Sequence, residues 1–285
     1  MIISHFPNNL PSNQDMVYPQ LIDAISKTDT LAVDNMNADA ALIWSVLWFG
    51  QMGKNKAVWD HYREQGKPVI VIEVGGLIRN ETWKLGINGI NRDADFALDV
   101  GVNPDRVKKF GIELQPWITD DKPYILICGQ HAHSQQWADM PDMETYFRET
   151  VTQVREYSDK PIVLRSHPRF RENLHFPVKD AEWFKQQNCE WNIAKQVQQT
   201  YDSFDLENQL KETQLTVSYC SNAGINSVIQ GIPSIVSEHS LAYGVTSTFE
   251  ELRRPDREDW LVDMCNIEWF ADEIGEQWLK IRQKL

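Results

Sequence analysis

The chain has 285 residues and a formal net charge of −13 at pH 7, a length that allows one large domain or two of roughly 120 to 150 residues. The acidic balance argues against a protein that binds nucleic acid mainly by neutralising phosphates, because that mode of binding needs clustered Lys and Arg. No apolar run approaches the roughly 18 residues of a membrane span, and the N-terminus lacks the basic and apolar regions of a signal peptide. We therefore expect a cytoplasmic protein with no membrane contact.

The four cysteines (Cys128, Cys189, Cys220 and Cys265) lie far apart and form no CxxC pair. This spacing predicts reduced structural thiols and argues against a zinc site.

In the first half of the chain, candidate strands and helices alternate. The patterns predict strands at residues 2–6, 30–34 and 67–74, and helices at residues 15–26, 56–65 and 103–110. Residues 38–49 are apolar nearly all round, which favours a buried helix, with a strand as the alternative. Residues 75–96 lack clean periodicity, and a loop of this length is usually functional.

The second half restarts the alternation after a linker at residues 113–122. It predicts strands at residues 122–128, 160–164, 215–219 and from 233, and helices at residues 141–157, 181–187, 203–212 (capped by Ser203), 223–230 and 266–285. Each half therefore reads as a doubly wound α/β domain. We expect an N-terminal domain of residues 1–115 plus the C-terminal helix 266–285, and a second domain of residues 119–260.

The stretch 215–236 has the pattern of a strand, a tight turn, a short helix and a second strand, which is a βαβ unit with a parallel sheet. Ser221 or Asn222 is suited to cap the helix, and Gly231 lies where a left-handed residue ends one. The free N–H groups at such a strand-to-helix turn form a binding site for anions.

Polar residues follow three strands of the second half at the ends where an open parallel sheet binds its ligands. One cluster is 129–131, the second is 165–169 together with Arg171, and the third is Ser221 and Asn222 with Asn226. Guanidinium groups match phosphate oxygens in bidentate pairs. The clusters therefore predict a phosphate-oriented ligand; a surface Arg cluster beside a capped turn is the alternative.

The dipeptide His167-Pro168 at one strand end, followed some 50 residues later by a small-hydroxyl turn and helix, resembles the nucleotide-binding half of GT-B glycosyltransferases. The pattern is most similar to the bacterial sialyl-, Kdo- and related transferases. The resemblance implies two Rossmann-like domains, a C-terminal helix that crosses back to the first domain, and a nucleotide-sugar co-substrate without cofactor or essential metal. It implies these donor-binding residues: Gly129, Gln130, His131, Arg165, His167, Arg169, Ser221, Asn222, Asn226 and Glu238.

These transferases carry their general base in an acidic-acidic-Gly motif after a strand of the first domain. Here the matching place reads Glu73-Val74-Gly75, with Val at the second acid. Glu73 is our first candidate for the base and Asp93 the second, beside His167 as the third catalytic residue. The alternative for Glu73 is a carboxylate that only caps the glycine turn.

The segment 71–93 is also similar to phage-encoded proteins assigned as glycosyltransferases. The acceptor is therefore either a glycan or a hydroxymethylated base in phage DNA, which would have to be flipped out of its helix. Arg79, Trp83 and Arg92 are the candidate acceptor contacts.

Several other readings compete with this one. Asp93-Ala94-Asp95 matches a DxD pattern that binds Mn²⁺, and His131 with His133 could serve as zinc ligands. The chain has no GxxxxGK[ST], GxGxxG or GxSxG motif, so a P-loop enzyme, a standard dinucleotide-binding protein and an esterase all lose support. The functional alternatives are a non-catalytic nucleotide-sugar-binding protein and a nucleotide-sugar epimerase.

Overall fold

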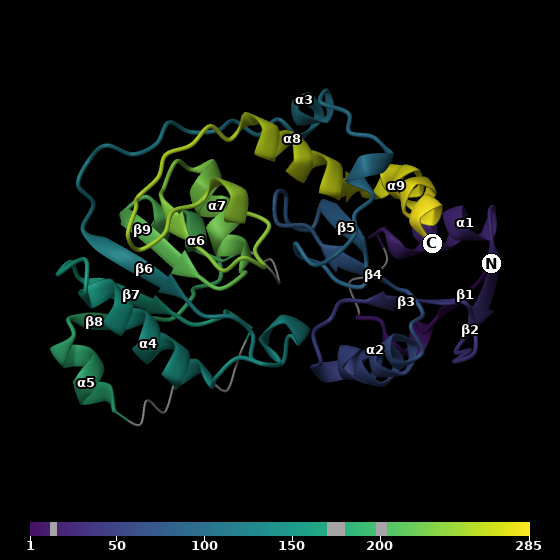
Figure 1. Cartoon of the computed structure of the whole chain (residues 1–285), viewed down its shortest axis with the longest axis horizontal. Helices are drawn as coiled ribbons and strands as arrows, with labels where there is room; N and C mark the ends of the chain where they lie inside the picture. Colours follow the sequence, from purple (N-terminus) through teal and green to yellow (C-terminus); the bar gives the residue numbers. More distant parts are fainter. Residues whose placement is uncertain (12–15, 170–179, 198–203) are drawn as a thin grey trace. The chain divides into compact units, whose positions relative to one another are not determined.

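The computed structural model describes residues 1–11, 16–169, 180–197 and 204–285. The chain divides into two compact units. The first contains Met1–Ile112, His133–Gln135 and Leu261–Leu285, and the second contains Glu113–Ala132 and Gln136–Trp260. Each unit is an α/β domain with its own sheet (Figure 1), so the predicted fold class is confirmed.

The first unit is built on a six-stranded sheet of order β11-β5-β4-β3-β1-β2. The strands are β1 (Ile2–His5), β2 (Thr30–Val33), β3 (Ala40–Trp44), β4 (Val69–Val74), β5 (Thr82–Ile87) and β11 (Glu268–Phe270). The helices are α1 (Tyr18–Ser26), α2 (Asn55–Glu64), α3 (Arg106–Phe110) and α9 (Ile274–Ile281), and α8 (Glu258–Ile267) contains the boundary between the units. Strands β1 to β4 are parallel, whereas β5 and β11 pair antiparallel.

Successive side chains along a strand of the first sheet point to opposite faces, and they belong to two separate hydrophobic cores. Leu42 and Ile70 lie in the core that holds α1 and α9, and their neighbours Ile43 and Val71 lie in the core that holds α2. Both faces of the central strands are therefore covered by helices, which is the doubly wound arrangement.

The prediction of a buried helix at residues 38–49 is wrong, because this segment contains β3. The strand lies between β1 and β4, and all five of its residues are buried. A strand covered on both faces is apolar at every position, so it shows no alternation that would distinguish it from a buried helix.

The long loop predicted at residues 75–96 contains a strand, β5, whose six residues are all buried. Its sequence, TWKLGI, alternates imperfectly because Thr82, Lys84 and Gly86 occupy the face opposite Trp83 and Leu85. A buried lysine and a glycine are untypical of a strand, so the pattern concealed it.

The second unit has an all-parallel five-stranded sheet of order β10-β9-β6-β7-β8. Its elements are β6 (Tyr124–Cys128), α4 (Met143–Arg155), β7 (Ile162–Arg165), α5 (Ala181–Gln186), β8 (Cys189–Asn192), α6 (Leu206–Leu210), β9 (Thr213–Ser218), α7 (Asn222–Ile229) and β10 (Ser234–Ile235). Counted from β6, the spatial order is 3-2-1-4-5, the order of a Rossmann sheet. The predicted cap Ser203 lies outside the described residues.

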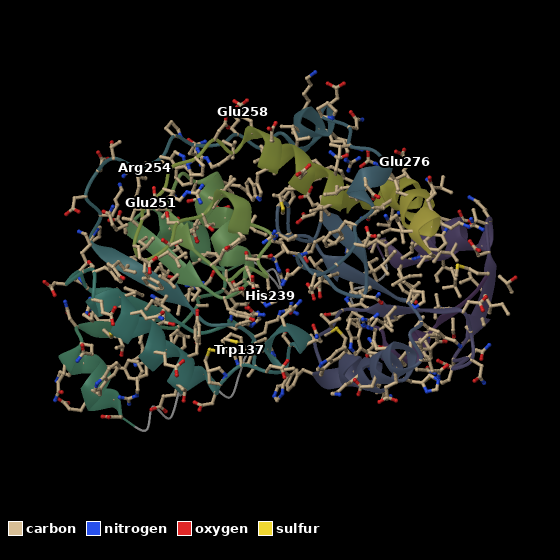
Figure 2. All side chains as sticks on the ribbon, viewed as in Figure 1. Trp137, His239, Glu251, Arg254, Glu258 and Glu276 are labelled. Atoms are coloured by element: carbon tan, nitrogen blue, oxygen red, sulfur yellow. The ribbon has the colours of Figure 1, made fainter. Side chains whose placement is uncertain are left out.

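Helices cover both faces of this second sheet. On one face, α4 and α5 pack with Trp137 on Ile127 and Leu164. Trp137 is labelled in Figure 2. On the other face, α6 and α7 pack on Leu126 and Cys128. The strand order and the two helical layers place the carboxyl ends of all five strands at one edge of the sheet.

The βαβ unit predicted at residues 215–236 is present as β9, α7 and β10. Gly231 follows α7 with a φ of +72°, the left-handed conformation that a helix-ending glycine supplies. A Cβ at Gly231 would collide with the carbonyl oxygen of Pro116. The segment predicted as a linker therefore packs on this turn, and Ile118 N donates to Gly231 O at 2.8 Å.

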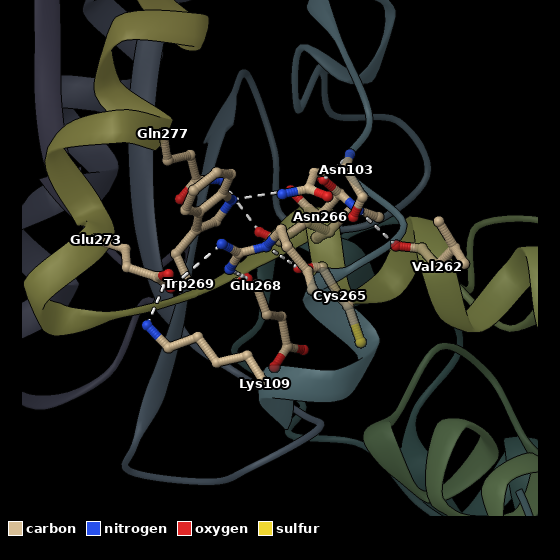
Figure 3. Close-up of polar contacts among 11 residues, drawn as sticks. Asn103, Lys109, Val262, Cys265, Asn266, Glu268, Trp269, Glu273 and Gln277 are labelled. Carbon is tan, nitrogen blue, oxygen red and sulfur yellow. Dashed lines mark hydrogen bonds and ion pairs between the residues drawn. The ribbon is translucent and has the colours of Figure 1, made fainter. Parts of the chain in front are cut away.

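The continuous helix predicted at residues 266–285 is wrong in part, because α8 and α9 are separated by β11. Arg106 stacks on Trp269 at 3.7 Å from the ring centroid and donates to the carbonyl oxygens of Cys265 (2.6 Å) and Glu268 (2.9 Å). Around it, Asn266 bonds Asn103 and Lys109 pairs with Glu273 (Figure 3). These contacts hold the C-terminal segment as the edge strand beside β5.

In the described ranges, none of the helices has the length and apolar content that a bilayer crossing requires.

Candidate active site

The order of the second sheet reverses between β6 and β9, which are neighbours although β7 and β8 intervene in the chain. Connections from β6 and β9 therefore leave toward opposite faces, and an open α/β sheet binds its ligand where this divergence occurs. Residues 129–131 follow β6 and residues 219–222 follow β9. The candidate donor site is this edge.

Gln130 connects the two diverging turns. Its side-chain oxygen Oε1 accepts a hydrogen bond from the backbone N of Cys220 at 3.2 Å and another from the Cys220 thiol at 3.1 Å. The preceding Gly129 has no room for a side chain, because a Cβ would lie 2.9 Å from the Phe147 ring. The fold thus fixes the backbone on both sides of the switch point.

Two histidines lie together beside this turn. The rings of His131 and His167 are 5.3 Å apart in an edge-to-face arrangement, and His131 is buried. The backbone N of Arg169 donates to Nδ1 of His167 at 3.2 Å. A neutral imidazole that accepts at Nδ1 carries its proton on Nε2, so the His167 ring presents Nε2–H as a donor.

The N-terminus of α7 completes the edge. Ser221 caps the helix, with its hydroxyl accepting from the backbone N of Ala223 at 3.1 Å. Asn222 and Asn226 are four residues apart, so they share one helix face, and both are half-buried. Glu238, which follows β10, is exposed. His239, the residue that follows Glu238 in the sequence, is labelled in Figure 2.

We expect Ser221→Ala to lower the free energy of unfolding of the second unit by about 1 kcal/mol and Ser221→Gly by only a few tenths. Alanine removes the cap and also disfavours the extended backbone of this position, whereas glycine leaves the N–H groups accessible to water. Urea denaturation of the three proteins measures the difference. Equal losses for the two variants would contradict the capping role.

Arg165 was predicted to contact the donor phosphate, but its guanidinium is used inside the second unit. Nη2 pairs with Asp205 at 2.8 Å, Nη1 bonds Gln209 at 2.7 Å and Asn192 at 3.2 Å, and the residue is 4% exposed. Arg165 therefore connects β7 with β8 and with the start of α6 through its hydrogen bonds. We remove it from the candidate contacts to the nucleotide-sugar donor. Arg169 is half-buried next to His167, and Arg171 lies outside the described residues.

Tyr219 is a residue that the sequence reasoning passed over. It lies between β9 and the cap Ser221, partly buried, with its ring centroid 5.4 Å from Trp137 and 6.0 Å from His239. An aromatic residue directly before the small-residue turn is the signal that could have identified it, since rings at such edges can stack on a nucleobase.

A second polar edge lies at the carboxyl ends of β3 and β4 in the first unit. Glu73 is half-buried, its Oε2 accepts from the hydroxyl of Ser45 at 2.5 Å, and its Oε1 accepts from the backbone N of Val74 at 2.9 Å. Ser45 itself was missed by the sequence analysis because it falls inside the segment predicted as a helix.

Asp93, the second candidate for the base, and Arg92, a candidate acceptor contact, do not lie at this edge with Glu73. Strand β5 runs antiparallel to β4, so the residues after it return to the amino end of β4, where the backbone N of Asn88 donates to Val69 O at 2.7 Å. Val69 and Glu73 are separated by about 13 Å along an extended strand. Both Asp93 and Arg92 are exposed there, so the two candidates for the base, Glu73 and Asp93, lie toward opposite ends of β4.

The other two predicted acceptor contacts differ in exposure. Trp83 is 3% exposed in the core with α1 and α9, so its ring is unavailable for stacking on a ligand. Arg79 is exposed in the turn after β4, at the same end as Glu73. The buried carboxylate of Glu268 holds this turn, accepting from the backbone N of Gly76 at 2.7 Å and of Leu77 at 3.0 Å.

The two metal patterns are not assembled into ligand sets. Asp95 accepts from the backbone N of Ala97 and lies 3.6 Å from the Lys284 amine, while His133 stacks on Phe49. Within the described ranges, no group of three or more His, Cys, Asp or Glu side chains is placed to hold a metal ion.

The cysteines are buried thiols in the described chain. Burial raises the pKa of Cys128, at the end of β6, to about 12, and it raises the pKa of Cys189 to about 11. A thiol with such a pKa is protonated at neutral pH and is not a nucleophile.

Two Rossmann-like units in one chain define the GT-B class of fold. Two solved structures from Thermosulfurimonas dismutans share it. KpsC described as a β-Kdo 2,4 transferase has a TM-score of 0.58 and 14% identity over 95% of this chain and 92% of its own. KpsC described as a β-Kdo 2,7 transferase has a TM-score of 0.52 and 14% identity, and the match covers 99% of this chain and 100% of the KpsC chain. At this identity the likeness establishes the fold. No protein-family model and no curated protein matches the chain.

Proposed function

We propose that the protein is a glycosyltransferase that moves a sugar from a nucleotide-sugar donor to a hydroxyl group of a carbohydrate acceptor. The observation that carries the proposal is the edge at the switch point of the second sheet. There Gln130 links the turns after β6 and β9, and His167 offers an Nε2–H beside them. The structural neighbours described as Kdo transferases support the same class of reaction.

The reaction displaces a phosphate at the anomeric carbon of the donor sugar. The acceptor oxygen forms a bond to that carbon, and the bond from the carbon to the phosphate oxygen breaks with its electron pair staying on the phosphate. Charge that develops on the phosphate is stabilised by preorganised donors. His167 Nε2–H and the N-terminus of α7 are our candidates for these donors, with Asn222 and Asn226 on the adjacent helix face.

The proton of the acceptor hydroxyl must pass to a base. Glu73 is our candidate, because it is a half-buried carboxylate at the carboxyl end of β4 whose two oxygens are both oriented by hydrogen bonds. A carboxylate has about four lone-pair positions, so two such bonds leave it able to accept a proton. No cofactor has a step in this scheme, and the nucleotide-sugar is a co-substrate.

A carbohydrate acceptor has better support than a modified base in DNA. The segment from Arg79 to Arg92 was the place where a DNA strand could lie, but its centre is the buried strand β5 and its two arginines lie at opposite ends of the sheet. The net charge of −13 also opposes a phosphate backbone.

The experiment is a thermal-shift panel of UDP-, GDP-, CMP- and ADP-sugars that includes Kdo, the sugar named for the two structural neighbours. A donor at 100 times its Kd should stabilise the protein by about 2.7 kcal/mol. His167→Ala should lose most of this stabilisation, whereas His61→Ala, in the first unit, should keep it. If no nucleotide-sugar raises the unfolding temperature, the donor site is contradicted.

A further inference from the structure

Ser45 has a backbone conformation that its residue type does not favour. It directly follows β3, is 4% exposed and has a φ of +61°. A left-handed conformation is unfavourable for a residue that carries a Cβ, and asparagine and aspartate tolerate it best. Of the other non-glycine residues that the structure describes with positive φ, all but Ala97 are Asn or Asp.

The hydrogen bonds of Ser45 explain what this conformation achieves. Its backbone N donates to Ile72 O at 2.8 Å and so continues the ladder between β3 and β4. Its hydroxyl accepts from the backbone N of Leu47 at 3.1 Å, closing a tight turn. The same hydroxyl donates to Oε2 of Glu73 at 2.5 Å, a distance typical of a charge-assisted bond.

Together with the Val74 N–H at Oε1, this bond holds both oxygens of the Glu73 carboxylate. The unfavourable backbone conformation is that of Ser45 itself, and the Ser45 hydroxyl makes the hydrogen bond to Glu73 in this conformation. Strained residues of this kind persist where the surrounding structure over-determines them, and they gather at functional sites.

We propose that Ser45 is a positioning residue that holds the Glu73 carboxylate in the orientation needed to take the proton of the acceptor hydroxyl. The inference rests on the proposed function, in which Glu73 is the base. The rate of transfer depends on the direction of the carboxylate lone pair, and misplacement by about 1 Å can cost roughly 100-fold in rate.

The decisive variant is Ser45→Gly, because glycine adopts a positive φ without strain. It removes the hydroxyl and keeps the backbone turn. We expect the unfolding midpoint to stay the same or rise, and kcat to fall by about 10- to 100-fold with the Kd of the donor unchanged. Ser45→Asn, which tolerates the same φ and carries a side-chain N–H donor, should recover part of kcat.

Ala97→Gly is the matched control, since Ala97 also has a positive φ (+56°) in the first unit and carries no polar group. It should leave kcat at the wild-type value. A Ser45→Gly protein with wild-type kcat, or one whose kcat falls only with its folded fraction, overturns the inference.

Glu73→Gln in the same assay tests the assignment of Glu73 as the base separately from the positioning role of Ser45. If Glu73→Gln is inactive and Ser45→Gly is fully active, the positioning role fails alone. If Glu73→Gln retains full turnover, the assignment of the base fails and the role of Ser45 fails with it. If both variants are impaired, adding Ser45→Gly to Glu73→Gln should produce no further loss, because the hydroxyl acts through the carboxylate.

Discussion

Glu73→Gln should lower kcat for sugar transfer by about 10²- to 10⁴-fold, the contribution that general bases typically make. The amide keeps the size of the side chain. Its single oxygen can still accept from the Val74 N–H, and its NH2 group can donate to the Ser45 hydroxyl oxygen. It cannot take a proton from the acceptor. The Kd of the donor should not change, because the candidate donor contacts all belong to the second unit.

Steady-state kinetics with saturating donor and acceptor, together with a donor titration, measure both quantities. Glu64→Gln is a matched control, since Glu64 is an exposed carboxylate at the end of α2 in the same unit. Unchanged turnover in Glu73→Gln would remove Glu73 as the base. A non-catalytic binding protein would show no turnover to lose, and an epimerase would convert the donor without any acceptor.

Arg106→Met should lower the free energy of unfolding of the first unit by about 3–5 kcal/mol, the cost of breaking a buried ion pair by removing one partner. The guanidinium is 5% exposed and lies 3.2 Å from the Glu273 carboxylate, itself largely buried. Removal takes away the cation beside Oε2 of that carboxylate, whose Oε1 stays paired with Lys109 at 2.7 Å, and it leaves the carbonyl oxygens of Cys265 and Glu268 without the guanidinium donor. Each buried group left unsatisfied adds to the loss.

Chemical denaturation followed by tryptophan fluorescence tests this effect, because Trp269 lies under the guanidinium. Lys108→Met is the control on the same helix. Lys108 is an exposed cation paired with its helix neighbour Asp105 at 2.7 Å, so its loss should leave the unfolding midpoint unchanged. A stability loss no larger than that of the control would show that Arg106 is not the anchor of the C-terminal segment.

The second sheet could be predicted well from sequence because its signals are local. A β-branched or apolar run that ends at polar residues marks β6, β7 and β9 directly, and Ser221 and Gly231 have the cap and end roles expected of them. The strand β8 was not predicted, because its four residues CEWN alternate between apolar and polar over the shortest length at which alternation indicates a strand.

The first unit was harder to predict: β3 is apolar at every position, β5 contains a buried lysine and a glycine, and β11 depends on long-range pairing. Nothing local to residues 268–270 indicates that they pair with residues 82–84, nearly two hundred positions earlier. The apolar spacing of Ile267, Phe270 and Ile274 also fits a helix, so the interruption by β11 was invisible.

The residues of the candidate site also differ in whether a local sequence signal predicts their position. His167 could be placed after a strand and Ser221 at a helix cap, because both positions have local sequence signals. The burial of Arg165 could not be read, since its partner Asp205 comes from a different part of the chain. The position of Asp93 depended on recognising that β5 turns back along β4.

The edge strand β11 has a consequence for how the polypeptide matures during translation. Strand β5 is synthesised well before the ribosome reaches residues 268–270, and the whole of residues 113–260 emerges in between. Domains fold as units during synthesis, so the second unit can be complete while the first still exposes one side of β5. The sheet of the first unit is therefore completed only after the sequence of the second unit has been synthesised.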